Sequence, residues 1–173
     1  EPKYSPMSEL FVAKDKNPNL KIIEHSTQNN IDFGNRIWCH RVNGIERMKE
    51  AKAHFEGFEI DLEYREEGWF EVNHPPQKGI GLRLENVLKV SKNESAFWLD
   101  CKNLTSENAS QAAHHLKKVI ESQTTIGKVL VESPCLECLT PFDSLGFKTV
   151  YYLPFLHQMP DNQLQETLFS IDK

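Results

Sequence analysis

The sequence predicts a parallel (β/α) barrel of the TIM type, incomplete at its C-terminal end. Three observations lead to this fold class. From residue 36 onward, strand-like and helix-like segments alternate, which is typical of parallel strands joined by crossover helices. About seven strands can be assigned, whereas a closed barrel of this type has eight. The chain has 173 residues, whereas such barrels run to roughly 250.

The expected elements follow from apolar periodicity and from turn residues. Strands are expected at 36–42, 57–64, 69–74, 96–102, 128–132, 147–153 and 167–171, and helices at 44–55, 82–90, 106–122, 136–145 and 161–166. Ser106 is expected to cap its helix, and Gly146 to end the helix before it. Residues 1–35 are polar and rich in Pro and Asn, which predicts an irregular leader. Residues 36–173 are expected to form one barrel domain.

Composition narrows the classes of partner. A net charge of −5 argues against a nucleic-acid-binding surface, because phosphate contacts need clustered Lys and Arg. No apolar run approaches the length of a membrane span, so no transmembrane segment is expected. The composition is that of a globular protein. It fixes neither the oligomeric state nor the compartment, and a secreted or periplasmic location is as compatible as a cytoplasmic one.

Two of the four cysteines form a Cys135-x-x-Cys138 pair. There is no second pair at the spacing of a zinc ribbon. The first interpretation is two residues of a helix and turn near the core. A disulfide is the second interpretation, and a metal site the third.

Acidic residues occupy the ends of the predicted strands. Glu59 and Asp61 alternate with apolar residues, which places both carboxylates on one face of a strand, and Asp100 is near the end of a later strand. Carboxyl ends of barrel strands meet at one rim, so we expect these acids to converge. A hard divalent cation, Mg²⁺ or Ca²⁺, would relieve their repulsion, and zinc is less favoured. For Glu132, an extra ligand and a partner of Lys102 are both open interpretations.

Histidines and cations accompany the acids. His40 and His74 are placed at strand ends and could share the roles of general acid and base. Lys102 and Arg41 could hold the non-bridging oxygens of a phosphate. For Asn43, a loop role is favoured over a phosphate contact. This set of residues predicts metal-assisted cleavage of a phosphodiester.

Four segments in this order, "HRVNGIERMKEA", "FEIDLEY", "VNHPP" and "WLDCKNL", resemble the glycerophosphodiester phosphodiesterase-like superfamily of TIM barrels, also called phospholipase C-like phosphodiesterases. They look closest to its menorin-like branch. Sphingomyelinase D, a related branch, shows a similar spacing of first histidine, acid pair and second histidine. The resemblance covers residues 36 to about 153.

The resemblance implies a metal-dependent hydrolase of glycerophosphodiesters or phospholipid headgroups, and therefore a small phosphodiester or a lipid headgroup as its partner. It matches His40, His74, Lys102 and Arg41 to catalytic positions, and Glu59, Asp61 and Asp100 to metal ligands. One departure is that Pro-Pro follows the second histidine, where the phosphodiesterases usually carry an acid. Two alternatives remain: a catalytically silent barrel that binds a lipid headgroup or a protein, and a metal hydrolase of carboxylic esters.

Overall fold

The computed structural model describes residues 37–91, 95–153, 160 and 163, all within the compact unit Ile31–Lys173. The predicted leader lies outside the described residues, as does the predicted strand 167–171. Only residue 163 of the predicted helix 161–166 is described, and it is helical.

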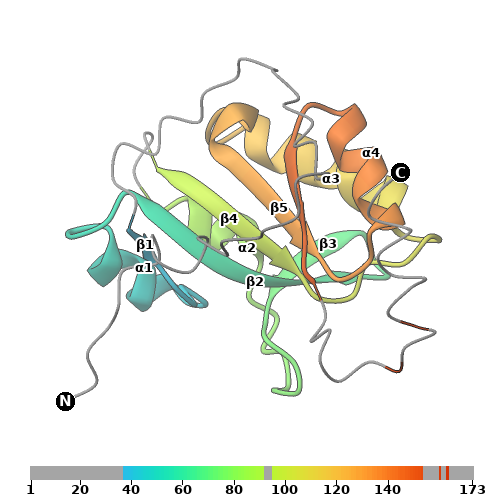
Figure 1. The fold of residues 1–173 in the computed structure, drawn as a ribbon. Helices are drawn as coiled ribbons and strands as arrows, with labels where there is room; N and C mark the ends of the chain where they lie inside the picture. Colours follow the sequence, from blue (N-terminus) through green and yellow to red (C-terminus); the bar gives the residue numbers. More distant parts are fainter. Residues whose placement is uncertain (1–36, 92–94, 154–159, 161–162, 164–173) are drawn as a thin grey trace, which may run out of the picture. The chain divides into compact units, whose positions relative to one another are not determined.

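A six-stranded sheet forms the centre of the described chain (Figure 1). Its strands are β1 (Trp38–Cys39), β2 (Gly57–Arg65), β3 (Trp69–Val72), β4 (Ala96–Cys101), β5 (Val129–Ser133) and β6 (Lys148–Tyr151). Five of them run parallel in the order β1-β2-β4-β5-β6, which confirms the predicted parallel α/β architecture. Within the described residues the sheet is open, because β1 and β6 lie at the two ends of this order.

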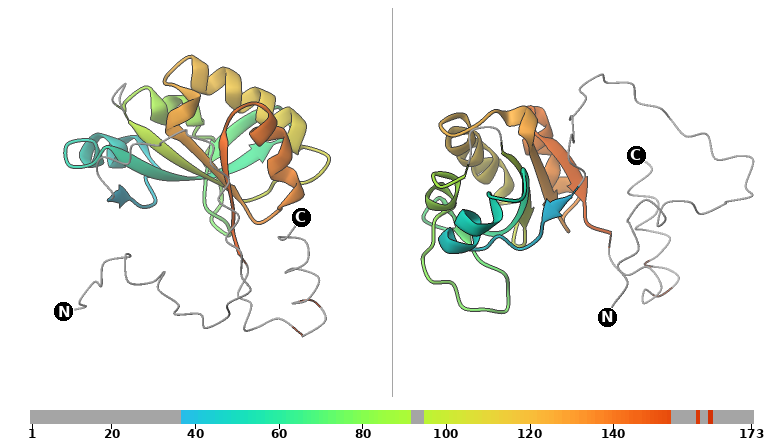
Figure 2. Two further views of the ribbon diagram at one scale, coloured as in Figure 1. Left: turned by 45° about the horizontal axis from the view of Figure 1, so that its top comes forward. Right: turned by 90° about the vertical axis from the view of Figure 1, so that its left-hand side faces the viewer.

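The helices lie together on one side of the sheet (Figure 2). They are α1 (Ile45–Ala51), α2 (Leu84–Leu88), α3 (Ala109–Glu121) and α4 (Thr140–Ser144), with 3-10 turns at Ile126–Lys128 and Glu137–Leu139. Alternate strand residues such as Ile60, Leu99 and Val131 are fully buried and form the core with the apolar stripe of α3. The residues between them point to the opposite face, and that face carries the acids.

Strand β3 differs from the prediction. It was expected to be the next parallel strand of the barrel, but it pairs antiparallel with β2, with Leu62 opposite Val72. The connection at residues 66–68 is too short for a parallel crossover, and Gly68 adopts a φ of +80° that suits a tight turn. The hairpin turns the chain back, so that the backbone N–H of Asn73 donates to the carbonyl of Asp61 at 3.1 Å.

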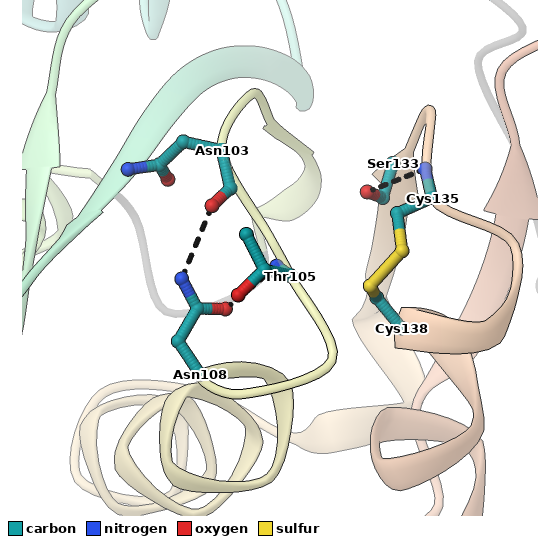
Figure 3. Close-up of a disulfide and its surroundings, with 6 residues drawn as sticks. All are labelled: Asn103, Thr105, Asn108, Ser133, Cys135 and Cys138. Carbon is teal, nitrogen blue, oxygen red and sulfur yellow. Dashed lines mark hydrogen bonds between the residues drawn. A yellow bond between two sulfur atoms is a disulfide. The ribbon is translucent and has the colours of Figure 1, made fainter.

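Helix ends follow local hydrogen bonds. Helix α3 starts later than predicted: Asn108, not Ser106, precedes it. The side chain of Asn108 accepts from the N–H of Thr105 at 2.9 Å and donates to the carbonyl of Asn103 at 3.1 Å, which shapes the loop after β4 (Figure 3). Gly146 ends the helical segment as predicted, with a φ of +91°.

The cysteine pair lies in a turn and 3-10 helix near the core, as the first interpretation expected, but Cys135 and Cys138 also form the disulfide of the second interpretation, with a Cα–Cα distance of 5.3 Å (Figure 3). The tight turn after β5 brings the two cysteine side chains close enough to bond. Cys39 and Cys101 are free and buried. Among the described residues, no helix has both the length and the apolar character needed to cross a membrane.

Candidate active site

Three carboxylates meet on the face of the sheet that is opposite the helices. Glu59 and Asp61 come from β2, and Asp100 comes from β4. One carboxylate oxygen of each lies within 4.8 Å of the others. The residues are only 5%, 1% and 8% exposed, respectively. The structure therefore brings together the acids that the sequence assigned to a metal.

Strand register explains this convergence. Asp61 and Asp100 are direct partners in the parallel pairing of β2 with β4. Glu59 lies two residues before Asp61, so its side chain shares the same face. Carboxylates this close and this buried repel one another unless they are compensated by positive charge.

Lys102 supplies part of that compensation. Its Nζ lies 2.9 Å from Asp61 Oδ1 and also donates to Asp100. Burial alone would lower the pKa of Lys102, but its hydrogen bonds to the two aspartates outweigh burial, so that its pKa is raised. Lys102 therefore stays charged and sits between the two acids.

Glu59 is held differently. Its Oε2 accepts the backbone N–H of Arg41 at 2.5 Å and lies 3.4 Å from His40 Nε2. Burial is the main cause that raises the pKa of Glu59, and the charge of Asp61 adds to it, while the N–H of Arg41 and the imidazole of His40 act in the opposite direction. Among the described residues Lys102 forms ion pairs with Asp61 and Asp100 but not with Glu59, so the negative charge of the cluster is only partly compensated.

Asn43 contacts an acid of the site, although its sequence context favoured a loop role. Its Nδ2 donates to Asp61 Oδ2 at 2.6 Å, and its Oδ1 accepts the backbone N–H of Asp61 at 2.9 Å. One amide thus fixes both the backbone and the carboxylate of this acid. Its position three residues after His40, in the segment that carries the resemblance, was the available signal.

The two histidines flank the acids. His40 follows β1 and its side chain is 70% exposed, next to Glu59. His74 follows β3 and its Nε2 lies 3.9 Å from Asp61 Oδ1. The hairpin delivers His74 to this place, so the position of His74 does not come from a parallel barrel strand as we had expected.

Arg41 contacts His74 rather than an acid through its side chain. Its Nη2 lies 3.3 Å from His74 Nε2, a geometry that requires Nε2 to act as the acceptor. Arg41 has a φ of 55°, the only described residue other than glycine with a positive φ. Backbone strain of this kind gathers at functional sites, and it here aims the N–H of Arg41 at Glu59.

Glu132 adds a fourth acid beside the cluster. It is the register partner of Asp100 on β5 and is 7% exposed. Its Oε2 accepts the indole N–H of Trp98 at 2.9 Å. Burial, followed by the charge of Asp100, raises the pKa of Glu132 to about 6. Two interpretations of Glu132 were open. Among the described residues it forms no ion pair with Lys102, and its role as an extra ligand stays a prediction.

The donor set fits a hard divalent cation. The three converging groups are all carboxylates, the ligands that Mg²⁺ and Ca²⁺ prefer, and none of the three is a thiolate or an imidazole, which zinc would favour. Lys102 offsets only part of their charge. The cluster is therefore chemically suited to binding such an ion and, next to it, an anionic substrate.

Comparisons with known proteins show which other proteins share this fold. No family model matches the chain, and no curated protein matches it in sequence. Several solved structures, in contrast, match the chain in fold. The chain resembles a candidate glycerophosphoryl diester phosphodiesterase from Silicibacter pomeroyi, with a TM-score of 0.59 and 11% identity, over 73% of this chain and 68% of that one.

Two further structures have the same fold. A phosphodiesterase from Oleispira antarctica, solved in complex with the product sn-glycerol-3-phosphate, matches with a TM-score of 0.58 and 13% identity over 78% of this chain and 71% of that chain. A glycerophosphodiester phosphodiesterase from Thermotoga maritima matches with a TM-score of 0.51 and 15% identity over 74% and 63%. The chain therefore has a fold of the glycerophosphodiester phosphodiesterase type, the TIM-barrel class that the sequence predicted.

Proposed function

We propose that this protein is a metal-dependent phosphodiester hydrolase that acts on a glycerophosphodiester or a phospholipid headgroup. The observation that supports this most strongly is the buried cluster of Glu59, Asp61 and Asp100, with carboxylate oxygens within 4.8 Å of one another. Lys102 contacts two of these acids. The likeness in fold to phosphodiesterases supports the proposed class of reaction.

Glu59, Asp61 and Asp100 would hold the cation, which we expect to be Mg²⁺ or Ca²⁺. When bound, such an ion supplies Lewis-acid stabilisation of charge on a phosphate oxygen. Asn43 orients Asp61 for this task through two hydrogen bonds, and partners of this kind tune metal affinity.

The remaining residues bind the phosphate and move protons. Lys102 and Arg41 place positive charge where the non-bridging oxygens would lie, and charge-assisted hydrogen bonds from them are stronger in a partly buried site. His40 and His74 flank the acids. One takes the proton of the attacking hydroxyl, from water or from a neighbouring substrate group, and the other donates a proton to the leaving oxygen.

The test is hydrolysis of bis-(p-nitrophenyl) phosphate with and without a chelator. We expect turnover that needs Mg²⁺ or Ca²⁺, and a loss of roughly 10²- to 10⁴-fold in rate for His40→Ala and for His74→Ala. His114→Ala is the matched control, because His114 lies on the exposed surface of α3. Full turnover in both site variants would contradict the mechanism.

The same assay separates the alternatives. Turnover of p-nitrophenyl acetate alone would indicate a hydrolase of carboxylic esters. Cation binding without turnover of either ester would favour the silent barrel that binds a headgroup or a protein. The relation to the menorin-like branch and to sphingomyelinase D, and the assignment of residues 36–173 to one domain, are part of the same proposal.

A further inference from the structure

The disulfide between Cys135 and Cys138 lies in the connection that leaves β5, the strand that carries Glu132. Figure 3 shows it next to Ser133, the last residue of that strand. Glu132, the acid that is paired in register with Asp100, precedes Cys135 by three residues. A covalent bond therefore closes the turn that follows the strand end carrying Glu132, the acid beside the cluster.

The four cysteines of the chain differ in burial. Cys39 and Cys101 are buried free thiols, and burial raises the pKa of the Cys101 thiol, which makes it unreactive. Cys138 is 1% exposed. Cys135 is the one cysteine that is partly exposed. A reductant must reach a disulfide sulfur to open the bond, so Cys135 is the point of attack.

The bond acts locally. It closes a ring of only a few residues, with a sequence separation of 3, so it restrains the unfolded chain little. In the folded protein it fixes the path around Ser133. The Oγ of this fully buried serine accepts the N–H of Cys135 at 3.2 Å, and its carbonyl accepts the N–H of Tyr152 at 3.0 Å.

We propose that Cys135–Cys138 is a redox-sensitive site whose oxidised form holds the end of β5 and thereby keeps Glu132 in place beside Asp100. A dithiol reductant opens it. Once the ring is open, the N–H of Cys135 is no longer held against Ser133, the end of β5 loosens, and the acidic cluster binds its cation less tightly. Cys135 and Cys138 are positioning residues in this scheme, because they act through Ser133 and Glu132.

The exchange balances with a dithiol as co-reactant. Its first thiolate attacks the Cys135 sulfur, the S–S bond breaks, and Cys138 leaves as a thiolate that takes up a proton. The second thiol of the reductant then attacks its own mixed disulfide and releases Cys135, which is protonated in turn. Two electrons and two protons pass from the dithiol, which becomes a disulfide, to the cysteine pair.

The first test is direct and independent of any enzymatic activity. Dithiothreitol is added to the full-length native protein, thiols are counted after rapid alkylation and unfolding, and amide hydrogen exchange is followed by mass spectrometry. We expect the thiol count to rise from two to four and protection to fall in residues 132–139, while β2 and β4 keep theirs. Unchanged thiols, or unchanged exchange in that segment, would overturn the proposal.

The second test measures the coupling to the site, and this arm rests on the proposed function. Mg²⁺ affinity is measured calorimetrically with and without dithiothreitol. We expect roughly tenfold weaker binding in the reduced protein, the scale of a lost outer-shell partner. The double variant Cys135→Ser/Cys138→Ser should bind as the reduced protein does, with no response to dithiothreitol.

The outcomes separate the two proposals. Equal Mg²⁺ affinity in oxidised and reduced protein would overturn the coupling. If neither form binds Mg²⁺ or Ca²⁺, the proposed function fails, and thiol counting and hydrogen exchange alone decide the redox proposal. Cys39→Ala serves as the control for unspecific thiol effects and should respond to dithiothreitol as the parent protein does, with its free-thiol counts one lower throughout.

Discussion

Asn43 holds Asp61 by two hydrogen bonds at once, one to the backbone N–H at 2.9 Å and one to the carboxylate at 2.6 Å. Asn43 precedes α1, whereas Asp61 lies in the middle of β2. The turn after β1 is thus tied to one of the two acids that Lys102 contacts. The orientation of this acid therefore depends on a neutral amide from another part of the chain.

Replacing Asn43 tests that dependence. Asn43→Ala should weaken cation binding by roughly 10- to 100-fold, the scale of a lost outer-shell partner, and should lower the free energy of unfolding by about 1–3 kcal/mol. Asn103→Ala is the matched control, because Asn103 bridges the N–H and carbonyl of Tyr64 in the same way. It should lose similar stability but keep its cation affinity. Equal effects on cation affinity would refute a special role for Asn43.

Lys102 competes with the cation for two of the acids. Lys102→Met should lower the free energy of unfolding of the metal-free protein by about 1–3 kcal/mol, because buried charges lose a partner. The same change should enlarge the rise in melting temperature on adding Mg²⁺ or Ca²⁺, since the freed carboxylates gain more from the ion. Melting curves with and without the ions measure both effects. A smaller rise than in the parent protein would mean that Lys102 does not compete with the cation for these carboxylates.

The raised pKa of Glu132 predicts that the free energy of unfolding depends on pH. This pKa is raised from an ordinary value of 4.5 to about 6, chiefly by burial. Between these values the folded protein holds a proton that the unfolded chain has released, so the metal-free protein should lose stability as pH rises through this window. Urea unfolding at several pH values should show a loss of the order of 1–2 kcal/mol that Glu132→Gln removes.

Glu59 contributes in the same direction, because its pKa is also raised, so Glu132→Gln should reduce the slope without abolishing it. Glu121→Gln is the control, because this residue is exposed at the end of α3. A slope that is identical in Glu132→Gln and in the control would show that folding does not raise the pKa of Glu132.

Two substitutions of Arg41 separate the effect of backbone strain from the effect of losing the side chain. The φ of 55° at this residue favours glycine, and relief of this strain is worth about 1 kcal/mol. Arg41→Gly should therefore be more stable than Arg41→Ala by about that amount, whereas both should lose turnover for want of the guanidinium. Urea unfolding and diester hydrolysis measure the two effects. If the two variants are equally stable, the positive φ is not a constraint on this residue.

The sequence predicted the parallel architecture and the facing acids because both depend on local periodicity. Alternation in "FEIDLEY" fixes which side chains share a face, and burial of Ile60 and Leu62 fixes which face turns to the helices. The register of Asp61 with Asp100 follows from packing between strands that are distant in sequence. It was inferred only from the general rule that carboxyl ends of parallel strands meet.

Other features were beyond local reasoning. Strand β3 was assigned correctly as a strand but not as a hairpin partner, because direction is set by pairing and not by composition. Asn43 was missed because an amide after a strand usually serves a loop, and only the fold shows that it reaches Asp61. The disulfide was ranked second because spacing alone does not show whether two thiols converge.

The most direct test of the central claim is a calorimetric titration of the metal-free protein with Mg²⁺ and with Ca²⁺. We expect one ion to bind per chain. Asp100→Asn should bind it far more weakly, and Glu121→Gln should bind it as the parent protein does. If the parent binds neither ion, or if Asp100→Asn binds as tightly as the parent, then Glu59, Asp61 and Asp100 do not form a metal site.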